Sequence, residues 1–209
     1  MTCNVIATGS KGNAVLLYDS ILVDCGVPFT KLSNYLNGLQ IVLLTHHHAD
    51  HFNISTIKKI ARLRPALRFA APSWMAEMLR KVGIYNIDEA RDGEWLDYGF
   101  MRIMQQSIPH DVQNCAWHIV KGTEKIIYAT DCGSLDGVSA PNYSLYLIEA
   151  NYVTQELEAR QAAKLAAGKF SYESRAAASH LSKEQAQEWV ESQAGVNSKV
   201  IYLHQHTGG

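Results

Sequence analysis

The feature that most constrains this chain is a run of histidines that directly follows an apolar segment. Residues 45–51 read Thr-His-His-His-Ala-Asp-His and contain the pattern H-x-H-x-D-H at His46, His48, Asp50 and His51. A chain of this length with nine histidines matches such a pattern by chance on the order of 10⁻³ times. Neutral imidazoles and carboxylates suit Zn²⁺, Mn²⁺ and Fe²⁺. The run therefore predicts a metal site, with a histidine-rich surface loop as the alternative.

Four ligands so close together in sequence do not easily surround one ion, which indicates two adjacent ions. Further ligands are expected where predicted strands end. His110 follows one predicted strand, Asp131 a second and His204 a third. Each signal is weak alone, because a single strand-end His or Asp is usually a structural turn residue. Together with the histidine run they complete a set of seven metal ligands: His46, His48, Asp50, His51, His110, Asp131 and His204.

Composition places the chain among ordinary globular proteins. Of its 209 residues, 47% are hydrophobic and 19% are charged, which excludes a disordered, collagen-like or coiled-coil chain. Lys plus Arg number 19 and Asp plus Glu number 20, so the net charge is −1 and a large basic field for non-specific DNA binding is absent. We find no internal repeat at the level of residues and no linker, and we expect a single domain over residues 1–209.

The amino-terminal segment MTCNVIATGS has neither the basic nor the apolar region of a secretory signal. The longest apolar runs are far shorter than the ~20 residues that a membrane span needs. The four cysteines lack CxxC spacing. We therefore expect a cytoplasmic protein without a membrane partner, whose cysteines are reduced and mostly buried thiols.

Apolar periodicity and turn residues divide the chain into strands and helices. Strands outnumber helices early and alternate with them later, which predicts a layered α/β arrangement of two mixed sheets with helices outside. Asn53 is a predicted helix cap, and Ser182 with Gln185 fits a capping box. Strands are expected at 3–8, 14–18, 21–24, 41–45, 67–71, 100–107, 115–121, 125–130, 144–149 and 199–203. Helices are expected at about 28–36, 54–63, 72–83 and 153–167, and from residue 183 onward.

The order of these motifs resembles the metallo-β-lactamase-fold superfamily over nearly the whole chain. The shared pattern is H-x-H-x-D-H, an isolated His, a strand that ends in Asp and a carboxy-terminal strand that ends in His. The resemblance implies a four-layer αββα sandwich with the metal site at one edge of its two sheets. Carried over by motif, it implies that the first ion is held by His46, His48 and His110, the second by Asp50, His51 and His204, and both by Asp131.

Other segments resemble the YycJ-like branch of this superfamily. They are the glycine-rich turn at 9–13 (GSKGN) and the segment at 22–26 (LVDCG). The segments at 147–152 (LIEANY) and 179–182 (SHLS) resemble both that branch and ribonuclease Z. In that branch, the resemblance implies, Glu149 orients His180, and His180 assists the leaving group or the scissile phosphate. The compact length also resembles that of phage-encoded relatives.

Several departures narrow the resemblance. The chain has no room for the second domain of β-CASP nucleases, and no arm like the one with which ribonuclease Z grips tRNA is evident. Asp131 stands where some zinc β-lactamases carry Cys, and His48 stands where flavodiiron oxidoreductases carry Glu. The terminal Leu-His-Gln-His offers two candidates for the last ligand, and we prefer His204, directly after its strand, to His206.

These observations favour a hydrolase with two divalent metal ions, Zn²⁺ first and Mn²⁺ or Fe²⁺ as alternatives. We expect a phosphodiesterase or nuclease in which a metal-bridging hydroxide is the nucleophile, oriented by Asp50. Glu149 and His180 would act near the leaving oxygen. The substrate would be nucleic acid or a small phosphodiester. The alternatives are a small-molecule hydrolase (cyclic phosphodiesterase, thioesterase, lactonase or β-lactamase) and a metal-stabilised binding subunit. A homodimer is implied by the resemblance alone.

The remaining polar residues receive structural or supporting roles. Asp24 is a candidate to support the ligand histidines, and His47 is expected to face solvent or to play the same supporting part. His118 is expected to be a strand residue, and Cys132 is expected to point away from the ligands. A basic rim for phosphates or a merely solvated helix face would explain Lys11, Lys31, Lys58, Lys59, Arg62 and Arg64.

Overall fold

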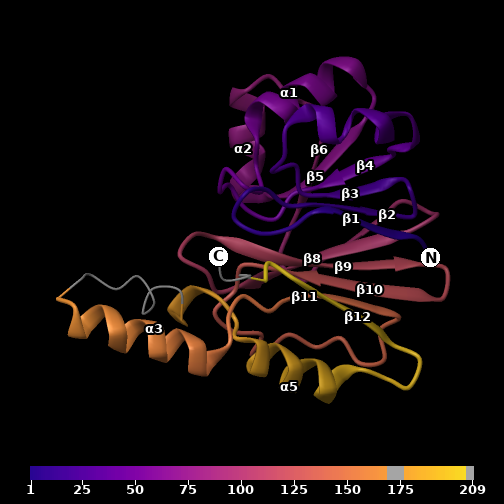
Figure 1. Cartoon of the computed structure of the whole chain (residues 1–209). Helices are drawn as coiled ribbons and strands as arrows, with labels where there is room; N and C mark the ends of the chain where they lie inside the picture. Colours follow the sequence, from indigo (N-terminus) through magenta and orange to yellow (C-terminus); the bar gives the residue numbers. More distant parts are fainter. Residues whose placement is uncertain (169–176, 206–209) are drawn as a thin grey trace. The chain divides into compact units, whose positions relative to one another are not determined.

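The computed structural model describes residues 1–168 and 177–205 of the chain (Figure 1). It divides into two compact units, Met1–Gln105 and Gln106–Gly209, and the division falls inside strand β8 (Arg102–Ile108). The single domain expected over residues 1–209 stays a prediction. In the described ranges, every helix is too short or too polar to cross a bilayer.

The first unit contains a six-stranded sheet in which strand order follows chain order. The first three strands pair antiparallel, and the third to sixth pair parallel. The third and fourth strands are completely buried, as expected for parallel strands that are covered on both faces. The strands are β1 (Cys3–Ala7), β2 (Ala14–Leu17), β3 (Ile21–Val23), β4 (Ile41–Leu43), β5 (Arg68–Pro72) and β6 (Ile87–Ala90).

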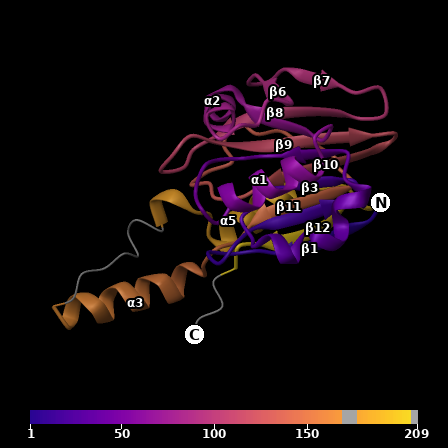
Figure 2. The same ribbon diagram turned by 90° about the horizontal axis from the view of Figure 1, so that it is seen from above.

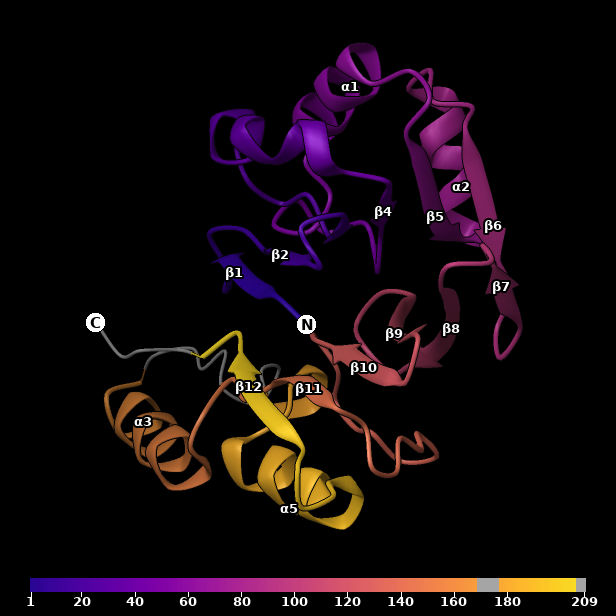
Figure 3. The same cartoon turned by 90° about the vertical axis from the view of Figure 1, so that its right-hand side faces the viewer.

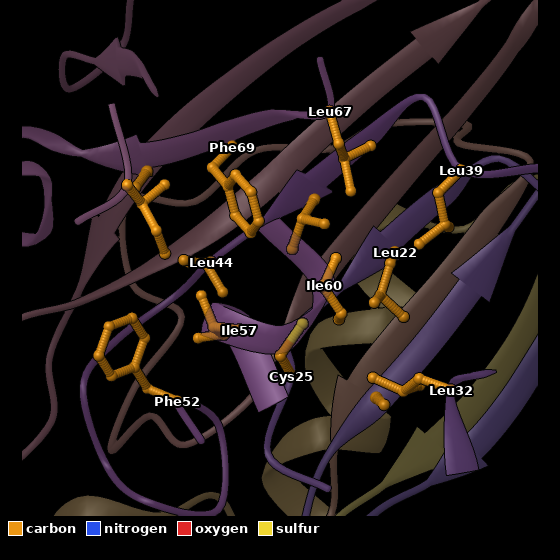
Figure 4. Packing of buried hydrophobic residues seen from close by; sticks show 14 of the residues in the cluster. Leu22, Cys25, Leu32, Leu39, Leu44, Phe52, Ile57, Ile60, Leu67 and Phe69 are labelled. Atoms are coloured by element: carbon orange, nitrogen blue, oxygen red, sulfur yellow. The ribbon is translucent and has the colours of Figure 1, made fainter. Parts of the chain in front are cut away.

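Two amphipathic helices cover this sheet, α1 (Ile54–Leu63) and α2 (Ser73–Lys81). Ile57 and Ile60 of α1 pack into a core that includes Leu22 and Phe69 of the sheet (Figure 4). The predicted cap is present, since the Asn53 side chain accepts the Thr56 backbone N–H at 3.1 Å. The helix predicted over 28–36 is instead two short 3₁₀ segments, η1 (Phe29–Lys31) and η2 (Ser33–Gly38).

The second sheet has the strand order β12-β11-β10-β9-β8-β7. Strands β9 and β10 form an antiparallel hairpin, whereas β10, β11 and β12 run parallel. Because parallel strands end at the same edge of a sheet, the residues that follow these three strands lie close together. Besides β8, the strands are β7 (Trp95–Asp97), β9 (Asn114–Lys121), β10 (Glu124–Ala129), β11 (Leu145–Glu149) and β12 (Lys199–Leu203).

Helix α5 (Lys183–Gln193) lies beside β11 and β12 (Figure 3). It buries Ala186 and Val190 in a core with Tyr146 and Ile148. The predicted capping box is present, because Ser182 and Gln185 each accept the other's backbone N–H.

Helix α3 (Thr154–Ala166) differs from the other helices because it projects from its unit (Figures 1 and 2). Among its described residues it buries Leu157 alone. The excursion that carries α3 is closed at its base by a parallel bridge between Tyr152 and Ser182. There the Asn151 N–H donates to the Leu181 carbonyl at 2.9 Å, and the Lys183 N–H donates to the Tyr152 carbonyl at 2.7 Å. The helix predicted over about 153–167 is present, but sequence reasoning did not indicate that it projects.

Candidate metal-binding site

The histidine run forms the loop that leaves strand β4. His46 and His51 are completely buried, and His48 is half-buried. The Asp50 side chain is 24% exposed, so its carboxylate is accessible to solvent and to a substrate. His47 is exposed, in agreement with its expected solvent-facing position.

Asp24, which follows strand β3, holds two residues of this loop in place. It lies next to the start of the loop because β3 and β4 pair in parallel with Val23 opposite Leu43. Its buried carboxylate accepts the backbone N–H and the hydroxyl of Thr45, both at 3.0 Å. The same carboxylate lies 2.7 Å from His51 Nδ1. Nδ1 of His51 therefore donates to the carboxylate, and the lone pair is left on Nε2, as a metal-binding imidazole requires.

His46 and His48 turn their ring nitrogens toward one another. His46 Nδ1 lies 3.0 Å from the Thr45 hydroxyl, and His46 Nε2 lies 3.2 Å from His48 Nδ1. Two nitrogens that bind one tetrahedral Zn²⁺ at about 2.0–2.1 Å are separated by about 3.3 Å. The spacing of these two nitrogens therefore suits two ligands of one ion.

Asn13, at the end of the glycine-rich turn, holds the loop from the other side and is only 2% exposed. Its backbone N–H donates to the Asp50 carbonyl at 2.6 Å, while its side-chain oxygen accepts the Gly9 N–H at 2.8 Å. This second bond fixes the orientation of the amide, so the NH₂ group faces the loop. Nδ2 lies 2.7 Å from His51 Nε2 and 3.4 Å from the Asp50 carboxylate. Sequence reasoning noticed the turn but assigned Asn13 no role.

Gly26 allows the loop to come this close. A Cβ atom at Gly26 would lie 1.6 Å from the Asp50 carbonyl oxygen, so any other residue would displace the loop. The Gly26 N–H donates to the Asn13 carbonyl at 2.9 Å. Backbone hydrogen bonds therefore connect Gly26 to the glycine-rich turn and the turn to the histidine loop.

In the second unit, four polar side chains meet at the edge where β10, β11 and β12 end. Asp131 follows β10, Glu149 ends β11, His204 follows β12, and His180 approaches from the segment before α5. Each offers an oxygen or nitrogen atom that lies within 4.8 Å of those of the other three. The register, with Glu149 opposite Leu203, explains why His204 extends past the end of β11.

Glu149 is the centre of this group and is completely buried. Its Oε1 lies 2.6 Å from His180 Nδ1 and 3.0 Å from His204 Nδ1, while Oε2 accepts the Cys132 N–H at 2.9 Å. Burial raises the pKa of Glu149, but hydrogen bonds from the two histidines outweigh burial and lower it. The group is therefore a buried carboxylate that is held ionised by its neighbours.

The pKa values of the two histidines shift in the opposite direction, upward. Burial lowers the pKa of His204, but its hydrogen bonds to Asp131, at 2.7 Å, and to Glu149 outweigh burial and raise the pKa to about 10. Burial likewise lowers the pKa of His180, and the bond to Glu149 more than compensates, so the net shift is upward. Two buried carboxylates thus attract positive charge to this edge.

His110 lies beside this group, and its side chain is only 2% exposed. Its ring centroid is 5.2 Å from that of His180. Nδ1 donates to the Ser179 carbonyl at 2.9 Å, and Nε2 lies 3.1 Å from the Asp111 carboxylate. Burial lowers the pKa of His110, which favours the neutral ring that binds metals.

A short motif occurs at both clusters, and the expectation of no repeat overlooked it. The tripeptide Asp-Cys-Gly stands at 24–26 and at 131–133. Both aspartates have left-handed backbone, with φ of 61° and 54°, and both bond a histidine at 2.7 Å. In both, the glycine faces a backbone carbonyl, since a Cβ at Gly133 would lie 2.5 Å from the Ala178 oxygen. The same turn therefore presents a carboxylate to an imidazole in each unit.

Three further expectations concern His118, Cys132 and His206. His118 is a residue of β9 bonded to the Tyr143 hydroxyl and to Gln106, each at 3.0 Å, as expected for a structural histidine. Burial raises the pKa of the Cys132 thiol, so it is not poised as a thiolate ligand. His206 lies outside the described residues.

Within each unit, the structure brings predicted ligands together. The first unit joins the four side chains of the histidine run, and the second joins Asp131 and His204 to the Glu149–His180 pair. A single site built from all seven predicted ligands stays a prediction.

Comparison with known proteins adds a family model and solved structures. Residues 19–204 match the family model described as a Beta-lactamase superfamily domain. No curated protein sequence matches the chain.

The metallo-β-lactamase fold protein YhfI from Bacillus subtilis has a TM-score of 0.75 and 22% identity, over 99% of this chain and 87% of that one. The short form of human tRNase Z has a TM-score of 0.69 and 15% identity, over 98% and 93%. A diphosphatase from the PhnP family has a TM-score of 0.64 and 12% identity, over 97% and 85%. At these identities the likeness shows the fold alone, and it confirms the predicted fold class.

Proposed function

The chain belongs to the β-lactamase superfamily, and on that premise we propose that it is a metal-dependent hydrolase of phosphodiester bonds. The observation that carries the proposal is the buried Glu149 carboxylate, whose Oε1 contacts both His180 and His204. A carboxylate-held histidine beside candidate metal ligands is suited to deliver a proton to a leaving oxygen.

The side chains fit a pair of divalent ions. Buried carboxylates are stable only when they are paired or bind cations, and Asp131 and Glu149 lie within reach of the same histidine. The 3.2 Å spacing of the His46 and His48 nitrogens and the lone pair that Asp24 leaves on Nε2 of His51 suit the same chemistry. We assign the first ion to His46, His48 and His110, the second to Asp50, His51 and His204, and both to Asp131.

Side chains of the protein orient the attacking water and deliver a proton to the leaving oxygen. When bound, two such ions activate water and neutralise the charge on phosphoryl oxygens. Asp50, the most accessible carboxylate of the loop, accepts a hydrogen bond from the attacking water and orients it. Nδ1 of His180 is occupied by Glu149, so the proton for the leaving oxygen comes from Nε2. Glu149 keeps the ring in that orientation.

Two comparisons support phosphate chemistry over other hydrolyses. By their names, one similar structure is a tRNase and another is a diphosphatase. The second candidate is a small-molecule hydrolase. It is favoured by the near-zero net charge of the chain, because a protein that attracts a long polyanion benefits from an excess of basic residues.

The test is a substrate panel with the Zn²⁺- or Mn²⁺-loaded protein: bis(p-nitrophenyl) phosphate, single- and double-stranded DNA, RNA, a cyclic nucleotide, a thioester, a lactone and nitrocefin. We expect cleavage of one or more phosphodiesters. Asp50→Ala should lower that rate by more than about 100-fold, the upper range for loss of a group that merely supports a ligand. His47→Ala, in the same run but exposed, is the matched control and should retain activity.

Three outcomes contradict the proposal. Phosphodiester cleavage that is unchanged in Asp50→Ala would remove the assigned mechanism. Equal losses in Asp50→Ala and His47→Ala would contradict the role assigned to Asp50, because an exposed histidine of the same run would then matter as much. Turnover of nitrocefin, the thioester or the lactone without any phosphodiester cleavage would establish the small-molecule hydrolase instead.

A further inference from the structure

Several cations of the first unit are neutralised locally by carboxylates: Arg68 pairs with Asp88, Arg80 with Glu89 and Lys81 with Glu77. The cations of α1 differ from these, because the sequence of the helix, ISTIKKIARL, contains three basic residues and no acidic one. Within the described ranges, Lys58, Lys59 and Arg62 have no carboxylate partner. The charge of α1 is therefore directed to solvent rather than to the protein.

Two of these cations, Lys58 and Arg62, form one surface, which we call the α1 basic face. Lys58 and Arg62 are one turn apart and so lie on the same side of the helix. Both line a cavity of about 390 Å³ whose remaining wall is Ala61 with the end of α2, Val82 to Ile84. Lys59 instead lies over the Phe29 ring at 4.2 Å and is not part of this face.

Helix α1, which carries the basic face, begins directly after the histidine loop. Asn53, the cap of α1, is two residues beyond His51. At 1.5 Å per residue, Lys58 lies about 6 Å and Arg62 about 12 Å along the helix axis from its first residue. A chain of phosphates that leaves the loop along α1 would therefore meet one cation about every turn.

We propose that the α1 basic face binds the phosphate backbone of a polynucleotide and leads it to the histidine loop. The inference rests on the proposed phosphodiesterase function and names its substrate class as nucleic acid. Backbone contacts by Lys and Arg supply most of the affinity in sequence-independent binding. The cavity adds an apolar wall of Val82 and Ile84 beside two cations, which suits a phosphate with its attached sugar.

An anionic membrane is the competing partner for a basic helix. A helix that lies on a membrane inserts its apolar face into the bilayer. In α1 that face is already used, because Ile57 and Ile60 are fully buried in the protein core. The geometry therefore favours nucleic acid.

The experiment measures binding separately from turnover. Fluorescence anisotropy follows the metal-loaded protein with a labelled 20-nucleotide single strand whose phosphorothioate linkages resist cleavage. Lys58→Ala/Arg62→Ala is compared with Arg80→Ala/Lys81→Ala, which removes the same formal charge from paired cations of the same unit. Hydrolysis of bis(p-nitrophenyl) phosphate, too small to reach α1 from the loop, checks that each variant is folded.

We expect the α1 variant to bind the strand about 10-fold or more weakly, and its salt slope to fall by about 1.4 for two lost phosphate contacts on a single strand. The Arg80/Lys81 variant should bind within about 2-fold of wild type, because paired surface cations contribute little. Equal losses in both variants, or no loss in either, would overturn the inference. So would binding of phosphatidylserine vesicles through α1 by a protein that ignores the oligonucleotide.

The two proposals fail in different ways. Cleavage of the small diester with no α1-dependent binding of the strand refutes the inference and leaves the phosphodiesterase standing. Strand binding that depends on α1, without hydrolysis of any phosphodiester, refutes the proposed enzyme and leaves the binding surface.

Discussion

Asp24 Oδ2 lies 2.7 Å from His51 Nδ1, and both side chains are completely excluded from solvent. The bond joins the end of one parallel strand to the loop that follows the next. It fixes the direction in which His51 presents its second nitrogen, and it leaves that ring no freedom to turn away. The orientation of His51 therefore depends on a buried residue that does not contact the substrate.

Replacement of Asp24 by Asn should isolate the carboxylate charge. Asn tolerates left-handed backbone, so the turn at φ 61° is retained. Loss of the charge-assisted bond to His51 should weaken metal binding about 10–100-fold, measured by calorimetric titration of metal-free protein. Asp19→Asn is the control, because Asp19 is also left-handed, at φ 54°, but exposed. Equal metal affinity in Asp24→Asn and wild type would show that the carboxylate serves folding alone.

Asn13→Ala should loosen Asp50 and His51 together. The backbone bond from residue 13 to the Asp50 carbonyl survives, whereas the amide contacts to His51 Nε2 and the Asp50 carboxylate are lost. We expect the unfolding free energy of metal-free protein to fall by about 1–2 kcal/mol in a denaturant titration. Ser10→Ala, in the same turn and exposed, should have no effect. If Asn13→Ala lowers the unfolding free energy no more than Ser10→Ala does, the backbone hydrogen bonds alone hold the glycine-rich turn against the histidine loop.

Gly26→Ala should be among the most damaging single changes in the first unit. Its Cβ would overlap the Asp50 carbonyl oxygen, and relief requires the loop to move. We expect a loss of more than about 3 kcal/mol of stability, beyond the usual range for point substitutions. Gly137→Ala tests the alternative cause, because it has left-handed φ of 79° but open space around the new methyl group. Its cost should stay near 1 kcal/mol, roughly the penalty for left-handed backbone. Similar losses in both variants would contradict the steric argument.

Because His118 is buried, we predict that the free energy of unfolding of the second unit decreases at acidic pH. Burial lowers its pKa to about 4, below the ordinary value of 6.5. The unfolded chain therefore takes up a proton at this position before the folded chain does. Stability is complete above about pH 6.5 and decreases as the pH falls toward 4, by up to about 3 kcal/mol.

Denaturant titrations of metal-free protein at pH 7.5, 6 and 5 check this prediction. In His118→Gln the decrease over that range should be smaller than in wild type, although the variant starts from lower stability at pH 7.5. The exposed His47→Gln should retain the wild-type pH dependence. An unchanged pH dependence in His118→Gln would locate the acid sensitivity elsewhere.

His180→Gln separates proton delivery from the other steps. A diester with a nitrophenolate leaving group needs little help from an acid, whereas a nucleotide alkoxide needs it. The variant should lose about 10²–10⁴-fold in kcat on an oligonucleotide or a methyl ester, and much less on bis(p-nitrophenyl) phosphate. Glu149→Gln should follow the same trend with weaker selectivity, because Glu149 also contacts His204. Equal losses on both leaving groups would give His180 a structural role.

The sequence revealed the parts of the candidate site that are local. Residues 46–51 are visible as a motif because all four side chains leave one loop, and Asp131, Glu149 and His204 are visible because each ends a strand with a clear apolar pattern. Parallel pairing of β10, β11 and β12 then brings those three ends together, which is a general property of such sheets.

The parts that sequence reasoning missed depend on contacts between distant segments. Asn13 is 37 residues from Asp50, and nothing local indicates that its amide faces His51. Gly26 and Gly133 look like ordinary turn glycines, and only the approaching carbonyls show why no larger residue fits. Two 3₁₀ segments at 29–38 stand where a helix was predicted, because a proline at the start of so short a segment does not distinguish the two forms.

The bridge between Tyr152 and Ser182 fixes both ends of the segment that carries α3, and His180 lies just inside it, bonded to Glu149. Of the described residues of α3 only Leu157 is buried, so this helix can be lengthened or shortened while the two anchor points stay registered. We expect natural variants to differ in the length of α3, and a designer would splice a foreign module, a recruitment tag or a new specificity element there rather than into the residues next to His180.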